Sequence, residues 1–122
     1  MERMTISLPG IPPSLNKMAG RQNVWEYRQA KQEWTMLVYA YCKACKGRPK
    51  EPWNKAAVEI VYYFPDKRRR DADNYCGKFL LDGLTEAGVI VDDSMFHITL
   101  TIRGELDRKS PHTEIIVTKK EK

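Results

Sequence analysis

The segment from Ala56 to Phe64 constrains the fold most strongly. The spacing of a β-strand with one buried face is two residues, and it is met by Val58, Ile60, Tyr62 and Phe64. Pro65 then stops the pattern, because proline lacks the backbone donor that a strand ladder requires. Similar alternation predicts further strands, and a short apolar run predicts one more; they lie at 5–8, 89–91, 96–103 and 113–118.

Two helical patterns are interleaved with these strands. The first is predicted to run from Asn23 to Gly47, with Glu26 in the capping-box position. Its predicted core-facing residues are Tyr27, Ala30, Trp34, Leu37 and Tyr41, and Val38 and Cys45 widen this stripe. The second is predicted from Asn74 to Gly88, with a stripe of Cys76, Leu80, Leu84 and Ala87. The order β-α-β-α-β-β-β predicts one α+β domain over residues 1–122, with a mixed sheet and both helices on one face.

Composition bounds the partners and the compartment. The 122 residues suffice for one domain with its own core. The net charge of +5 and a pI near 9.2 favour a polyanionic partner. No apolar run approaches a membrane span, and three cysteines suit a reducing compartment, so we expect a cytoplasmic protein that does not enter the membrane. Cys42 and Cys45 have C-x-x-C spacing without a second pair, which favours buried thiols over a zinc site.

Acidic residues gather beside a basic run. Asp71 and Asp73 directly follow the basic run at 67–70, and Asp92 and Asp93 come some twenty residues later. Carboxylate oxygens suit hard divalent cations such as Mg²⁺, and adjacent arginines suit phosphate groups. This pattern indicates metal-dependent chemistry on a nucleic-acid backbone. The alternative is structural: the first acids cap a helix, and the second pair forms a polar turn.

The spacing of the acids suggests which of them share an ion. Asp71 and Asp73 point the same way if the chain is extended there. Asp93 follows a short strand that returns from the second predicted helix, which could bring it close, whereas Asp92 should point away. Lys78 is predicted one turn into that helix. It either stabilises negative charge at the phosphate or pairs with Asp82 four residues on.

Three separated blocks of the sequence resemble the RusA family of Holliday-junction resolvases over roughly residues 5–105. The blocks are Asp71-x-Asp73-Asn74 with Lys78 after it, Leu81-Asp82-Gly83-Leu84, and Ala87-Gly88-Val89-x-x-Asp92-Asp93. The opening Ile11-Pro12-Pro13-Ser14-Leu15-Asn16 and the pair Tyr27-Arg28 are also similar to that family. One departure is that Lys78 lies four residues after Asn74, where the family pattern has three. Either Gly77 absorbs the extra residue or Lys78 does not fill the family role.

The resemblance implies a small homodimeric endonuclease that requires Mg²⁺ or Mn²⁺. Such an enzyme would cut four-way DNA junctions by paired symmetric nicks, in DNA recombination and repair. The implied catalytic residues are Asp71, Asp73, Asp93 and Lys78, with the three aspartates holding the metal. We expect DNA contacts from polar residues around them, namely Asn16, Lys17, Lys67, Arg68, Arg69, Arg70 and Asn74.

Two other functions remain open from the sequence. One is a less selective nuclease for other branched DNA. The other is a non-catalytic junction-binding module whose acids only cap a helix.

Overall fold

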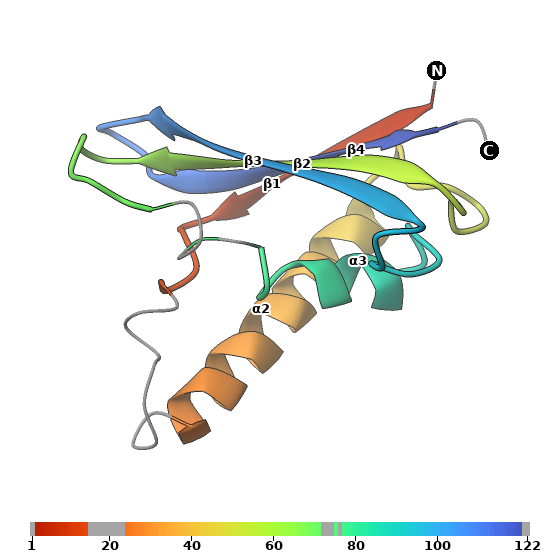
Figure 1. The fold of residues 1–122 in the computed structure, drawn as a ribbon, viewed down its shortest axis with the longest axis horizontal. Helices are drawn as coiled ribbons and strands as arrows, with labels where there is room; N and C mark the ends of the chain where they lie inside the picture. Colours follow the sequence, from red (N-terminus) through yellow and green to blue (C-terminus); the bar gives the residue numbers. More distant parts are fainter. Residues whose placement is uncertain (1, 15–23, 72–74, 76, 121–122) are drawn as a thin grey trace.

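A four-stranded mixed sheet forms the centre of the computed structural model, which describes residues 2–14, 24–71, 75 and 77–120. The spatial order of the strands is β1-β4-β2-β3, and only the β2–β3 pair is parallel (Figure 1). The strands are β1 (Arg3–Pro9), β2 (Ala56–Phe64), β3 (Ile98–Leu106) and β4 (His112–Lys119). The mixed α+β architecture that the sequence predicts is therefore confirmed.

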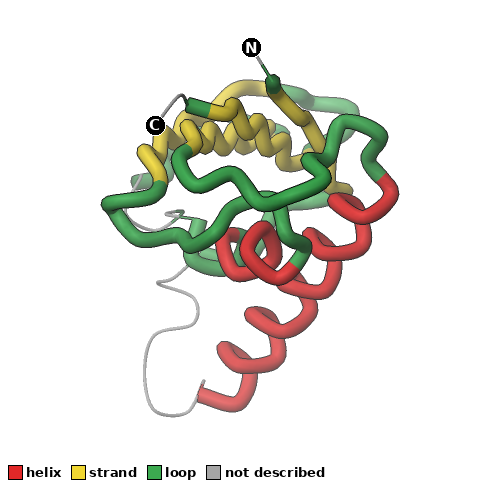
Figure 2. Tube along the Cα trace, turned by 90° about the vertical axis from the view of Figure 1, so that its right-hand side faces the viewer, coloured by secondary structure: helices red, strands yellow, loops and turns green. Residues whose placement is uncertain are grey.

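Two helices, α2 (Val24–Ala44) and α3 (Leu81–Glu86), cover one face of this sheet (Figures 1 and 2). The order of the helices and strands agrees with the prediction, but residues 89–91 contribute only an isolated parallel bridge between Ile90 and Trp53. Within the described ranges, neither helix is both long and apolar enough to cross a membrane.

The core lies between the sheet and the helices. Alternate residues of the inner face interlock across three strands; for example, Ile115 of β4 is opposite both Ile6 of β1 and Ile60 of β2. All three are buried, as are Val38 of α2 and Leu84 of α3 on the helical side. The period-two pattern of the sequence thus becomes the buried face of the sheet.

Most of the predicted stripe of α2 packs against the core, with Val38 buried and Trp34 and Leu37 partly buried. The helix ends at Ala44 rather than Gly47, and its buried residues are Thr35, Val38 and Cys42, while Tyr41 is exposed. The close approach of α3 accounts for the burial of Val38. A Cβ on Gly83 would lie 2.5 Å from the Cβ of Val38, so α3 packs directly on this residue.

The second helix starts later than predicted. It begins at Leu81 instead of Asn74, which lies outside the described residues, and residues 78–80 form a turn. Gly77 has a φ of +80°, a left-handed conformation that a continuous α-helix does not contain. The backbone N–H groups of Leu80 and Leu81 both donate to the carbonyl of Gly77, which closes this turn.

Candidate metal and nucleic-acid site

The candidate site follows the carboxyl end of β2. The chain turns at Pro65 and Asp66, continues through the basic run, and returns against the strand it has left. The Tyr75 ring packs against Tyr62 and Phe64, with ring centroids 5.6 and 5.2 Å apart. Further on, a Cβ on Gly77 would lie 2.7 Å from Ile60 Cδ1. These contacts hold the loop alongside the last residues of β2.

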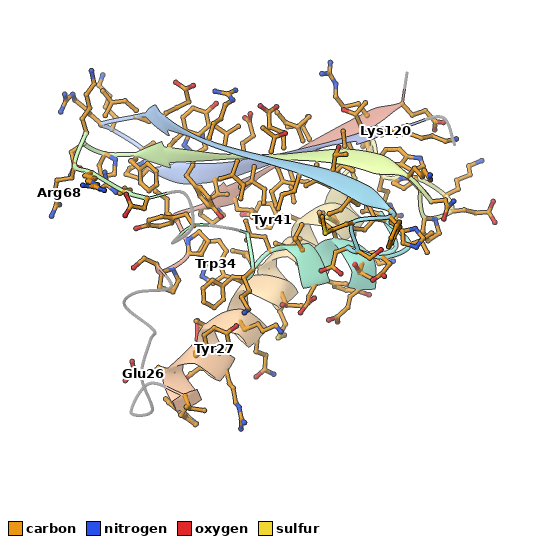
Figure 3. All side chains as sticks on the ribbon, viewed as in Figure 1. Glu26, Tyr27, Trp34, Tyr41, Arg68 and Lys120 are labelled. Carbon is orange, nitrogen blue, oxygen red and sulfur yellow. The ribbon has the colours of Figure 1, made fainter. Side chains whose placement is uncertain are left out.

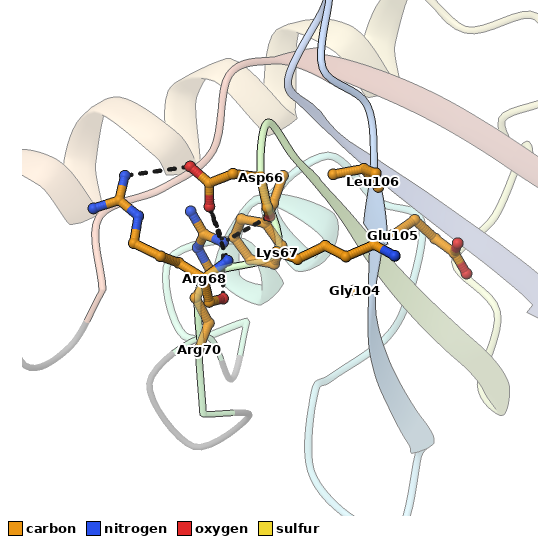
Figure 4. A pocket seen from close by; sticks show the side chains of 8 residues that line it. Asp66, Lys67, Arg68, Arg70, Gly104, Glu105 and Leu106 are labelled. Atoms are coloured by element: carbon orange, nitrogen blue, oxygen red, sulfur yellow. Dashed lines mark hydrogen bonds and ion pairs between the residues drawn. The ribbon is translucent and has the colours of Figure 1, made fainter.

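Asp66 organises the basic run. Its Oδ1 accepts a hydrogen bond from the backbone N–H of Arg68 at 3.0 Å, and its carboxylate pairs with the guanidinium groups of Arg68 and Arg70 at 3.3 and 2.9 Å (Figure 4). The hydrogen bond from the Arg68 backbone, followed by those from the two side chains, lowers the pKa of Asp66 to about 2. Sequence reasoning missed this residue, although an aspartate after Pro65 is typical of a side-chain-capped turn.

Arg70 and Arg68 have different surroundings. The Arg70 side chain is only 18% exposed, donates to the carbonyls of Asp66 and Arg68, and lies 4.3 Å from the centre of the Phe64 ring. The Arg68 side chain is 82% exposed and lies at the end of the sheet, pointing away from it (Figure 3). Arg70 therefore supports the loop, while Arg68 can reach a phosphate.

A cavity of about 490 Å³ opens beside this run (Figure 4). It lies between the basic loop and the end of the neighbouring strand β3, and its walls are formed by Phe64, Asp66, Lys67, Arg68, Arg70, Gly104, Glu105 and Leu106. Lys67 and Arg68 give it positive charge at an open surface. This is the charge that a DNA backbone phosphate requires.

Asp71 lies at the start of the acidic motif. Its Oδ1 accepts a hydrogen bond from Arg69 Nε at 3.1 Å, and both side chains are more than half exposed. The residue lines a cavity of about 100 Å³ together with Tyr62, Tyr75 and Gly104. An exposed ion pair of this kind adds little stability, so the Asp71 carboxylate can exchange Arg69 for a cation.

Asp93 lies near the opposite end of β2 from Asp71. The chain on both sides of Asp93 is hydrogen-bonded to residues at or just before the start of β2. Before Asp93, the Val89 carbonyl accepts a bond from Trp53 N–H at 2.9 Å. After it, the His97 carbonyl accepts a bond from Ala56 N–H. Asp93 is thus held near the start of β2, whereas Asp71 lies near its end, and a strand of nine residues spans about 30 Å. Among the described residues no metal-binding cluster forms, and Asp73 lies outside them, so the three-aspartate site stays a prediction.

Lys78 is exposed in the turn before α3 rather than one turn into a helix. Its Nζ lies 6.0 Å from the centre of the Tyr27 ring, which also packs against Phe79 at 5.5 Å. The alternative partner Asp82 pairs instead with Lys31 at 3.2 Å. Because Lys78 precedes the helix, its one-residue offset from the family pattern is not a helical rotation, and the left-handed Gly77 sets its direction.

Three further predicted DNA contacts, Asn16, Lys17 and Asn74, lie outside the described residues.

The C-x-x-C pair behaves as the sequence indicates. Burial of Cys42 raises the pKa of its thiol to about 12. Cys45 Sγ is 3.7 Å from the carbonyl oxygen of Thr5, as a weak donor.

The depressed pKa of Asp66 predicts a pH dependence of the basic loop. A carboxyl group whose pKa falls from 3.8 to about 2 on folding supports the loop above pH 4, and this support is lost as the pH falls toward 2. We expect the Asp66 carboxyl carbon to titrate near pH 2 by NMR. A midpoint near 4 would contradict the ion pairs with Arg68 and Arg70.

Comparison with known proteins identifies the family. The model of the family described as Endodeoxyribonuclease RusA matches residues 9–118. The chain is also 41% identical over 51 residues to a protein of Enterobacteria phage HK97, the crossover junction endodeoxyribonuclease rusA. That match spans 42% of this chain and 42% of the phage protein, less than half the length of either. Because the family match extends over most of the chain, this protein belongs to the RusA endodeoxyribonuclease family.

Proposed function

We propose that this protein is a divalent-metal-dependent endonuclease that resolves four-way DNA junctions by paired symmetric nicks, in DNA recombination and repair. The observation that carries the proposal is the family match over residues 9–118, which includes the acidic motif, Lys78 and the basic run. The exposed positive charge beside Asp71 supports it, since a junction nuclease needs phosphate contacts next to its reacting centre.

Asp71, Asp73 and Asp93 would hold the metal. Their oxygen donors suit Mg²⁺ or Mn²⁺, and Asp71 is accessible because its ion pair with Arg69 is exposed. The ion would polarise the scissile phosphate and make a bound water more acidic. Bringing Asp93 to the level of Asp71 would require a rearrangement or a second chain, since one copy holds their segments at different levels of β2.

The other residues bind and orient the DNA. Lys67, Arg68 and Arg69 would contact backbone phosphates, which fixes the position of the DNA without reading its sequence. The ammonium group of Lys78 would lie against the phosphate and stabilise its developing negative charge. The Tyr27 ring beside Lys78 limits where that ammonium group can go.

We expect alanine substitutions of Arg68 and Arg70 to have different effects, the first on DNA binding and the second on stability. Arg68→Ala should weaken junction and duplex binding alike, and should lower the slope of log K against log salt by about 0.9 for each phosphate that is no longer neutralised. Arg70→Ala should instead lower the melting temperature, because Phe64 loses its contact with the guanidinium group and Asp66 loses one of its two ion pairs. Fluorescence anisotropy over a salt series measures the first effect, with the exposed Lys43→Ala on α2 as control. An unchanged slope in Arg68→Ala would remove this residue from the interface.

A homodimer would explain paired cutting. A four-way junction contains two equivalent strands, and a two-fold dimer presents two identical sites to them. One copy of the chain supplies one acidic motif, so symmetric nicks require a second copy.

A substrate panel tests the proposed specificity. Purified protein is incubated with a four-way junction, a flap and a linear duplex of matched sequence in Mg²⁺. We expect cutting of the junction alone. Equal cutting of the flap would indicate the less selective nuclease, and binding without any cutting in Mg²⁺ or Mn²⁺ would indicate the non-catalytic module.

A further inference from the structure

Strand β3 is an edge of the sheet, and no further strand among the described residues pairs with its outer side. It is the last strand in the order β1-β4-β2-β3, and it pairs with β2 over nine consecutive residues without a bulge or a proline (Figure 1). Soluble proteins usually shield such an edge, because its free backbone groups can pair with another strand. The edge of β3 is therefore a candidate contact surface.

The two edges of the sheet are not alike. On β1, exposed and buried residues alternate regularly, and Pro9 ends the strand. On β3, all residues but Ile98 and Ile102 are exposed, including apolar Leu100 and Leu106, at 39% and 38%. Phe96, just before the strand, is 87% exposed. The helices leave this side of the inner face partly uncovered, so β3 combines an open backbone with apolar surface.

The free backbone groups of β3 belong to its even-numbered residues. Ala56 N–H donates to the His97 carbonyl at 2.9 Å, and Asp107 N–H donates to the Phe64 carbonyl at 2.8 Å. Odd-numbered groups therefore point toward β2, and those of Leu100, Ile102, Gly104 and Leu106 point outward. In an antiparallel pair, facing residues are of the same hydrogen-bonding type. Two copies of β3 can thus pair only even to even, which keeps their inner faces on the same side.

Charge selects one register among these. With Gly104 on the two-fold axis, Arg103 faces Glu105 of the second copy, and Ile102 faces Leu106 of the second copy. An opposite charge pair and an apolar pair then each occur twice by symmetry. Within one chain Arg103 already contacts Glu105, so both groups lie on the same side of the strand.

We propose that β3 is the dimer interface, and that it joins two copies of this chain antiparallel into one eight-stranded sheet. This inference rests on the proposed function only in naming the surface that would form its dimer. Both helical layers then lie on one face, as do the two loops that carry Asp71. Gly104 on the axis is opposite Tyr62 of β2, and Phe64 lies two residues further along that strand. With about 4.8 Å between neighbouring strands and a rise of about 3.3 Å per residue, the Phe64 residues of the two copies lie about 20 Å apart.

The dimer would place both candidate centres where one junction can reach them. Each cavity beside the basic run is lined by Gly104, Glu105 and Leu106, so in the dimer both cavities would adjoin the two-fold axis. Two candidate centres on one face, related by that axis, would meet two strands of a single junction without either copy reaching around the DNA.

Sedimentation without DNA or metal tests the interface apart from the nuclease activity. We expect the wild-type protein to be a dimer, and Leu106→Lys to raise the dimer dissociation constant at least about tenfold, because it places an ammonium group against Ile102. The control Thr5→Lys adds the same ammonium group to the exposed face of the other edge strand, β1, and should remain dimeric. A monomeric wild type, or equal dissociation constants in both variants, would overturn the proposal.

A cysteine cross-link tests the register and does not depend on weakening the fold. Facing residues of a hydrogen-bonded pair lie about 5.5 Å apart at Cα, within the range of a disulfide. Gly104→Cys should therefore form a covalent dimer under mild oxidation. Leu100→Cys should not, because residue 100 would face residue 108 of the second copy. Cross-linking of Leu100→Cys with none at Gly104→Cys would refute the proposed axis.

Discussion

Replacing Asp71 with asparagine should lower junction cutting by about a hundredfold or more while leaving junction binding intact. The substitution keeps the shape of the side chain and removes the negative charge that would hold the metal. A bound metal ion stabilises the charge of the transition state by several kcal/mol. Because about 1.4 kcal/mol of activation free energy is a factor of ten in rate, loss of a metal ligand should slow cutting by at least this factor. Binding should persist, because phosphate contacts come from the neighbouring basic residues. Single-turnover cutting and anisotropy on the same junction separate the two effects.

Asp92→Asn is the matched control for this experiment. Asp92 is an exposed carboxylate next to Asp93, and it is not among the expected ligands. It should therefore cut at the wild-type rate. If Asp71→Asn also cuts at the wild-type rate, Asp71 is not a metal ligand and only its exposed pair with Arg69 remains.

Replacing Gly83 with alanine should destabilise the fold more than any other single methyl group added at the glycines described in the structure. The new Cβ would lie 2.5 Å from Val38 Cβ and 2.9 Å from the backbone carbonyl oxygen of Thr35, and backbone cannot move aside cheaply. Overpacking of this kind costs about 1–3 kcal/mol, and occasionally more. We expect a melting temperature lower by roughly 5–10 °C, measured by circular dichroism.

Gly47→Ala is the control for the added methyl group. Its Cβ would meet its neighbours at 3.5 Å or more, which is ordinary contact, so its melting temperature should stay close to that of the wild type. Equal melting temperatures for Gly83→Ala and the wild type would show that α2 and α3 do not pack closely at this glycine.

Strand positions can be predicted from the sequence because their pattern reflects burial directly. Residues 56–64 alternate, and the structure has β2 at Ala56–Phe64. The structure of the segment 89–91 is harder to predict, because a short apolar run can be buried as a strand, a helix or a loop. In the structure it forms only an isolated bridge to Trp53. Local pattern alone does not distinguish a strand from a single buried crossing of the chain.

Helix details depend on contacts that no local pattern contains. The start of α3 is set by the left-handed Gly77, although the apolar spacing continues before it. The burial of Val38 in α2 depends on its close contact with Gly83, which is distant in the sequence. Tyr41, which the apolar spacing assigns to the core, is exposed.

The candidate site is visible from the sequence as a set of charges, but not as an arrangement. Asp71 and the basic run are adjacent in the sequence, so their proximity is predictable. The division of labour between Arg68 and Arg70 is not, because it depends on Asp66 and the Phe64 ring. The separation of the Asp93 segment from Asp71 follows from its hydrogen bonds to the start of β2, which are long-range contacts.

The most direct measurement is digestion of a labelled four-way junction beside a matched linear duplex, with Mg²⁺ or with EDTA. The proposed function predicts two symmetric nicks in the junction, none in the duplex, and none in EDTA. Tight junction binding without cutting in either Mg²⁺ or Mn²⁺ would contradict it.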